Sequence, residues 1–160
     1  MSKVCLNLGS GMRNKREYVN IDAVKHTDAT VVGDILHLSY ADNSVDKIFS
    51  EHVIEHLDRA DTDQFFSECQ RMLRSGGELE MFLPCLRTWI QRYVRGEIDI
   101  TTLDLFLYGP QLHPYDFHRH GMFNEKLTAY CNKYGFKIIE LKPSDRTHSH
   151  WEIYLKATKN

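Results

Sequence analysis

The sequence predicts an α/β fold with a mostly parallel, twisted sheet, helices on both faces and an antiparallel hairpin at the carboxyl end. Three observations predict it. Short apolar runs in the first half alternate with turns and one helical pattern, which is the order of an α/β sheet. The second half is dominated by helical patterns. Its last two apolar runs are separated by a polar loop, which is typical of a hairpin.

Five strands are expected in the first half. Their apolar or β-branched residues are bounded by Gly, Asn, Asp and Pro, which mark turns. The expected strands are residues 3–8, 18–21, 30–32, 47–50 and 78–83. Since about nine residues separate the first glycines from the second strand, the crossover there must carry a minimal helix or none.

A helix is expected over residues 62–73, between the fourth and fifth strands. Its apolar positions lie on one face of a 3.6-residue period. They are Phe65, Phe66, Cys69, Met72 and Leu73. The glycines of "RSGG" are expected to end this helix, because glycine is favoured just after a helix C-terminus.

The second half is expected to add three helices and two strands. Residues 89–95 and 102–108 show helical patterns, and Leu127 and Cys131 lie on the face of a third helix that Gly135 ends. Residues 109–122 form a loop rich in Pro, Gly and His. The closing strands are expected over residues 136–141 and 151–157.

Length and composition fit a single domain spanning residues 1–160. The formal net charge of −2 argues against nucleic acid as a partner, and nothing indicates the oligomeric state.

No apolar run approaches the roughly 20 residues of a membrane span, and the first ten residues do not resemble a signal peptide. A cytoplasmic location is therefore expected. Four scattered cysteines without a C-x-x-C pair indicate reduced thiols.

Polar groups follow four successive strands. Strand one ends in Gly9-Ser10-Gly11, and strand two ends in Asp22, whose carboxylate can accept both hydrogen bonds of a ribose diol. Strand three is followed by Gly33-Asp34, an acid that can accept from an exocyclic amine. Glu51 and His52 follow strand four. Since ligands of open α/β sheets bind beyond the carboxyl ends of strands, these groups predict a nucleoside-like ligand.

Two nucleoside ligands compete. A dinucleotide fingerprint requires G-x-G-x-x-G, a helix that receives the pyrophosphate and an acid about 20 residues further on. Here Asn14 occupies the third glycine position, Asp22 comes 11 residues after Gly11, and no clear helix follows the turn. Asp34 also has no role in that template. S-adenosylmethionine, which carries no phosphate, fits these residues better.

Four segments resemble the successive motifs of a class I S-adenosylmethionine-dependent methyltransferase of the small, type 11-like kind. They are "LNLGSG", "NID", "VVGDILHLSYADNSVDKIFSEHVIEHL" and "ECQRMLRSGGELEMFLP". The resemblance implies a Rossmann-like fold in which residues 1–84 form the cofactor-binding half. Residues 85–160 would then supply the substrate-side helices, loop and closing strands.

The resemblance also implies how the cofactor would lie. The turn at residues 9–11 would pass under the methionine part, Asp22 would bind the ribose and Asp34 with the Ile35 amide would bind the adenine. Glu51 and His52 would border the sulfonium. The expected cofactor-binding residues are Asn7, Gly9, Ser10, Gly11, Asp22, Ala23, Asp34, Ile35, Glu51 and His52.

Histidines are the candidate catalytic residues. A base is needed only if the acceptor must lose a proton, and imidazole suits that role near neutral pH. His56 follows strand four, and His118 and His120 lie in the loop that would cover the cofactor. The alternative is that they brace these loops. His118-x-His120 and His148-x-His150 are weak evidence for zinc, so no metal site is expected.

The expected activity is methyl transfer from S-adenosylmethionine to an acceptor that no motif identifies. Analogy suggests a sugar, a glycan or a small hydroxyl compound. The main alternative is a non-catalytic S-adenosylmethionine-binding module or a partner subunit of a methyltransferase complex, which Asn7, Arg13 and the short first crossover favour. A different reaction with the same cofactor, or a nicotinamide-dependent oxidoreductase, are further alternatives.

Overall fold

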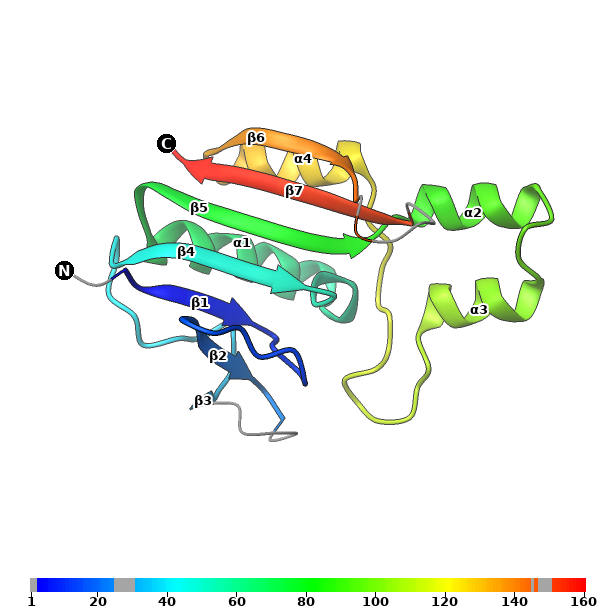
Figure 1. Cartoon of the computed structure of the whole chain (residues 1–160), viewed down its shortest axis with the longest axis horizontal. Coiled ribbons are helices and arrows are strands. Elements are labelled where there is room, and N and C mark those ends of the chain that lie inside the picture. Colours follow the sequence, from blue (N-terminus) through cyan, green and yellow to red (C-terminus); the bar gives the residue numbers. More distant parts are fainter. Residues whose placement is uncertain (1–2, 25–30, 145, 147–150) are drawn as a thin grey trace.

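A computed structural model describes residues 3–24, 31–144, 146 and 151–160. Thr30, where the third strand was expected to begin, lies outside these residues, as do His148 and His150. The described residues form one sheet with helices against it and beyond its end (Figure 1).

The sheet has seven strands in the order β3-β2-β1-β4-β5-β7-β6. The first five pair in parallel, whereas β7 runs antiparallel to both β5 and β6 (Figure 1). This order and the hairpin confirm the predicted fold class. The strands are β1 (Cys5–Leu8), β2 (Val19–Asp22), β3 (Val31–Val32), β4 (Val45–Glu51), β5 (Leu73–Pro84), β6 (Phe136–Pro143) and β7 (Glu152–Lys159).

The parallel register aligns the ends of the central strands. Leu8 of β1 pairs with Ile21 of β2 on one side and with Ser50 of β4 on the other. The residues that follow these strands therefore meet at one edge of the sheet. No helix separates β1 from β2, as the short crossover predicted: residues 9–18 form turns.

The core lies between one face of the sheet and two helices, α1 (Arg59–Met72) and α4 (Asn124–Lys133). Phe66 of α1 is fully buried and stacks on Tyr130 of α4, with ring centroids 5.0 Å apart and planes 7° apart. Asp63 accepts hydrogen bonds from Lys133 and from Tyr134 beside this stack. The two helices therefore cover the sheet as one layer (Figure 1).

The opposite face of the sheet carries no helix in the part of the chain that the structure describes, although the sequence favoured helices on both faces. Every second residue of β4, β5 and β7 on this face is polar or aromatic. Lys47 pairs with Glu80, and Lys156 pairs with Glu78 at 3.0 Å. Such a ladder of ion pairs cannot be buried under an apolar helix at low cost, so this part of the face stays hydrated. Phe49 on the same face is only 3% exposed, because Phe82 and Lys15 pack against it.

The remaining helices, α2 (Leu86–Val94) and α3 (Ile100–Tyr108), project beyond the carboxyl end of β5 (Figure 1). They pack on each other through Trp89 and Phe106, whose rings stack.

A short 3-10 turn, η1 (Ile54–His56), follows β4. No helix among the described residues combines the length and apolar character that crossing a membrane requires.

Helix α1 differs from its expected bounds at both ends. It begins at Arg59, because Asp58 caps it by accepting a hydrogen bond from the Asp61 N–H at 2.8 Å. It ends at Met72, where Leu73 becomes extended and starts β5. The expectation that "RSGG" ends the helix was wrong, since Gly76, with φ of 72°, lies inside β5 instead.

Replacing Phe66 with alanine should lower the free energy of unfolding by about 3–5 kcal/mol, because a buried aromatic side chain and its cavity are both lost. Chemical denaturation measures this. Ile139→Ala, at a side chain on β6 that is 52% exposed, is the control and should change the free energy little. Equal effects of the two substitutions would contradict the placement of the core.

All four cysteines are free thiols, and their reactivity should differ. Burial raises the pKa of the Cys69 thiol and raises that of Cys131 to about 11, and Cys85 is also buried. In native protein at neutral pH, an aromatic disulfide reagent should therefore modify only the partly exposed Cys5 at an appreciable rate. The Cys5→Ser substitution should remove this reaction in the native protein. In denaturant, all remaining thiols should react. Fast native modification of the Cys5→Ser variant would refute this.

Candidate functional site

A cavity of about 720 Å³ opens at the carboxyl edge of the sheet, within the range of small-molecule sites. Strand ends and the turn after β4 line one side of it, and the loop before α4 lines the other. The strand-end and turn residues are Gly9, Gly11, Asp22, Ala23, Val24, Val32, Gly33, Asp34, Ile35, Leu36, His52, Val53, His56, Leu57 and Asp61. The loop contributes Pro114, Tyr115 and Arg119.

The glycine turn after β1 is closely packed. Gly9 has a φ of 66°, and a Cβ at this position would lie 2.2 Å from Cγ2 of Val53. Only glycine fits both constraints. The turn is pinned to β2 because the Ser10 N–H donates to the Ile21 carbonyl at 3.0 Å. The backbone of residues 9–11 thus reaches the cavity without side chains in between.

Asp22 holds two backbone segments beside the cavity. Its Oδ2 accepts from the Gly11 N–H at 2.7 Å, and its Oδ1 accepts from the Val24 N–H at 2.9 Å. An ionised carboxylate has about four acceptor positions, so both oxygens can still accept from a ligand. The acid that ends β2 is therefore positioned in advance for a diol.

Asp34 borders the cavity together with its neighbour Ile35. Its side chain meets His37 Nδ1 at 2.9 Å and accepts from the Leu36 N–H at 2.9 Å. These two hydrogen bonds hold the pKa of the Asp34 carboxyl below its usual value. The Asp34 carboxylate is thus an ionised acceptor in the lining of the cavity.

Three of the expected cofactor-binding residues do not line this cavity in the described structure: Asn7, Ser10 and Glu51. Asn7 is 2% exposed and donates to the Arg13 carbonyl at 3.0 Å and to Oδ1 of Asn20 at 2.8 Å. Asn20 in turn accepts from the Lys15 N–H. This pair of asparagines ties the β1–β2 turn together where a helix is absent.

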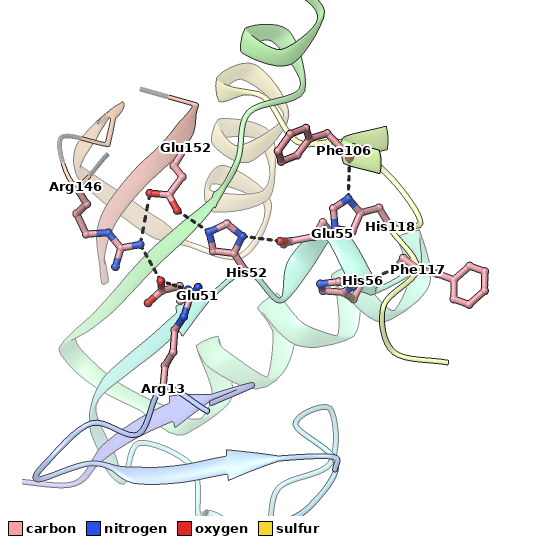
Figure 2. A network of polar contacts seen from close by, with 10 residues as sticks. All are labelled: Arg13, Glu51, His52, Glu55, His56, Phe106, Phe117, His118, Arg146 and Glu152. Atoms are coloured by element: carbon pink, nitrogen blue, oxygen red, sulfur yellow. Dashed lines mark hydrogen bonds and ion pairs between the residues drawn. The ribbon is translucent and has the colours of Figure 1, made fainter. Parts of the chain in front are cut away.

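Glu51 belongs to a network behind the cavity (Figure 2). It accepts hydrogen bonds from Arg13 and, at 3.1 Å, from Arg146. Arg146 also lies 3.5 Å from Glu152, the first residue of β7. Burial would raise the pKa of Glu51, but the two guanidinium groups hold it below its usual value. Arg13 thus has a structural partner.

His52 lies between two buried carboxylates (Figure 2). Its Nε2 is 2.6 Å from Glu152, and its Nδ1 is 3.3 Å from Glu55. Burial alone would lower the pKa of His52, but the carboxylates outweigh it and raise the pKa. The backbone of His52 has a φ of 54°, an uncommon conformation that aims the ring toward this pair.

The three histidines proposed as catalytic occupy different positions. His56 lines the cavity, and its ring lies 4.9 Å from that of His118, centroid to centroid. His120 lies behind them, with Nε2 at 3.3 Å from the Thr62 hydroxyl. Burial lowers the pKa of His56, and burial together with Lys126 and Arg59 lowers that of His120 to about 4. His56 and His120 are therefore neutral near pH 7.

Sequence reasoning missed Glu152 and Arg146, whereas Arg119 was expected in the loop that would cover the cofactor. Arg119 lines the cavity, and its N–H donates to the Glu55 carbonyl at 2.7 Å, which fixes the loop against η1. Glu152 was overlooked because only the carboxyl ends of strands were considered. In an antiparallel strand the amino end reaches that edge, and this rule could have found it.

Comparisons with known proteins agree with this geometry. Residues 4–81 match a sequence profile described as "Methyltransferase domain", of type 11. No curated protein sequence matches the chain at a significant level.

Many solved structures share the fold. A protein from Pyrococcus horikoshii OT3 is 17% identical with a TM-score of 0.70, covering 100% of this chain and 83% of that one. An S-adenosylmethionine-dependent methyltransferase from Methanosarcina mazei is 14% identical with a TM-score of 0.70, covering 99% and 93%. A Haloferax volcanii methyltransferase, solved with the Trm112 methyltransferase activator, is 14% identical with a TM-score of 0.64, covering 98% and 82%.

The sequence match covers the strands whose ends form the cavity, from β1 to the middle of β5. Over nearly its whole length, the chain shares the fold of solved S-adenosylmethionine-dependent methyltransferases. Residues 4–81 carry a methyltransferase domain of type 11.

Proposed function

We propose that the chain transfers the methyl group of S-adenosylmethionine to a hydroxyl oxygen of a sugar, a glycan or another small hydroxyl compound. The observation that carries the proposal is a 720 Å³ cavity that is lined by the strand-end acids Asp22 and Asp34 together with His56, Tyr115 and Arg119. The acids suit the nucleoside of the cofactor. The other three residues offer neutral and basic groups to an oxygen acceptor.

Seven of the ten expected cofactor residues support this placement by lining the cavity. In the proposal, the turn at Gly9 and Gly11 lies along the methionine part, Asp22 and Ala23 meet the ribose, and Asp34 with the Ile35 N–H meets the adenine. His52 borders the sulfonium. The other three residues would act indirectly. Asn7 and Ser10 hold the turn after β1 through hydrogen bonds, and Glu51 fixes the end of β4.

Methyl transfer is an in-line displacement in which the oxygen–methyl bond forms as the sulfur–methyl bond breaks. A hydroxyl acceptor also gives up its proton, so a base or an activating group near the methyl is needed. We assign this role to His56, which lines the cavity; His118 lies outside the lining, with its ring 4.9 Å from that of His56. His56 Nδ1 lies 3.3 Å from the Phe117 carbonyl, which leaves Nε2 for the acceptor. His120 would act through Thr62 and packing.

A second candidate is a non-catalytic cofactor-binding subunit of a methyltransferase complex. Exposed apolar residues on the projecting helices favour a partner: Val94 is 77% exposed and Ile100 is 60% exposed. The Haloferax volcanii relative, which was solved with an activator, gives a precedent for such assembly in this fold. Cofactor binding without transfer to any acceptor would support this candidate.

Asp22→Asn should weaken binding of S-adenosylmethionine by about 10- to 150-fold, because a hydrogen bond to a charged group contributes about 1.5–3 kcal/mol. Isothermal titration with S-adenosylmethionine and S-adenosylhomocysteine measures this, with NAD as a ligand that should not bind. Asp104→Asn, at an exposed position on α3, is the matched control. Unchanged affinity of Asp22→Asn would show that the ribose lies elsewhere.

His56→Asn should leave the cofactor affinity within about threefold but lower turnover by about 100-fold or more, as expected when a group that handles the acceptor proton is lost. Release of S-adenosylhomocysteine with a panel of sugars and small hydroxyl compounds measures turnover. His113→Asn, outside this cavity, is the control. A variant that loses cofactor affinity and turnover together would mean that His56 serves the cofactor instead.

A further inference from the structure

Two groups of side chains in the described structure bring three possible metal ligands within 4.8 Å of one another. One comprises Glu51, His52 and Glu152. The other comprises Glu55, His56 and His118 and will be called the Glu55 cluster (Figure 2). The two groups differ in how many positively charged side chains already lie beside their carboxylates.

The first group is an ionic network that is already balanced. Glu51 is paired with Arg13 and Arg146, and Glu152 is paired with His52 at 2.6 Å. Arg146 also approaches Glu152. Two guanidinium groups and an imidazole thus serve the two carboxylates, and an added cation would have to displace them.

In the Glu55 cluster, Glu55 is 4% exposed, and neither of its carboxylate oxygens has a hydrogen-bond partner among the residues described. Its charged contact is Nδ1 of His52 at 3.3 Å, without hydrogen-bond geometry. A buried carboxylate with so little compensation is costly unless another positive group binds it.

The two histidines of the cluster are oriented by backbone carbonyls. His118 Nδ1 lies 2.7 Å from the Phe106 carbonyl, and His56 Nδ1 lies 3.3 Å from the Phe117 carbonyl (Figure 2). A carbonyl only accepts, so Nδ1 of each ring carries a proton, and in the neutral imidazole Nε2 then presents its lone pair. Metal-bound histidines are held in this way, with the other ring nitrogen donating to a carbonyl or carboxylate.

We propose that Glu55, His56 and His118 bind a divalent first-row transition-metal ion. Two imidazole nitrogens and one carboxylate form a ligand set that Zn²⁺ and related ions favour, and three protein ligands leave positions open for water or substrate. His56 also lines the large cavity, so an open position can face it. The ion would add a second positive charge beside Glu55, whose other charged neighbour, His52, is shared with Glu152.

Its role would rest on the proposed methyl transfer and would replace direct proton transfer to Nε2 of His56, since that nitrogen would bind the ion. An ion at this rim would take the acceptor oxygen as a further ligand and lower the pKa of the hydroxyl, so that the oxygen attacks the methyl more readily. The proton would leave to solvent and no redox change is involved. Ion binding itself requires neither cofactor nor acceptor and can be measured separately.

The test is a titration of chelator-treated, untagged protein with Co²⁺, in which visible absorption measures binding. Zn²⁺ is then added as a competitor. We expect one equivalent to bind, with the bands of four- or five-coordinate Co²⁺, and Zn²⁺ to displace it. His118→Asn keeps a side-chain N–H for the Phe106 carbonyl but removes Nε2, and Glu55→Gln removes the charge. Each should weaken Co²⁺ binding by about 10- to 100-fold or more, since loss of a hydrogen-bond partner of a metal ligand alone costs about that much.

His113→Asn removes a surface histidine of the same loop and should bind Co²⁺ like the unmodified protein. Far-ultraviolet circular dichroism without metal checks that each variant is folded. Absence of saturable binding, or equal affinity of His118→Asn and the control, would overturn the proposal. Cofactor titration in chelator is a separate readout: metal binding without cofactor binding would refute the proposed function alone, and the reverse would refute the ion site alone.

Discussion

Parallel pairing of β1 with β2 and β4 is the interaction on which the site depends. The register that joins Leu8 to Ile21 and to Ser50 delivers the ends of three strands to one edge. Buried apolar residues such as Leu6 and Ile48 fix that register, because a slip of one residue would turn them to the hydrated face. The glycine turn, Asp22 and His52 are thus brought together by core packing several residues away.

The sequence was sufficient to predict the fold class and the strand ends, because both depend on local signals. Gly9 and Asp22 follow apolar runs directly, and both line the cavity. Asn7 lies inside β1 and Glu51 ends β4, and neither lines the cavity, since their partners Asn20 and Arg146 are set by tertiary contacts. No periodicity within the chain reports such contacts.

Helix ends and charge clusters escaped prediction for a related reason. The start of α1 depends on the Asp58 cap, which resembles any other loop acid in the sequence. The pairing of His56 with His118 joins residues 62 positions apart through a loop without regular structure. The chemistry at the rim of the cavity is therefore defined by the second half of the chain, where sequence patterns are weakest.

The placement of both helices on one face of the sheet has a consequence for folding. Because α1 and α4 cover the same side, the described residues form one main hydrophobic core. A sheet covered on both sides can lose one helical layer and keep the other as a partly folded intermediate. Here detachment of α1 would expose the packed side of the central strands with no second layer to hold them. We therefore expect unfolding to be a single cooperative transition.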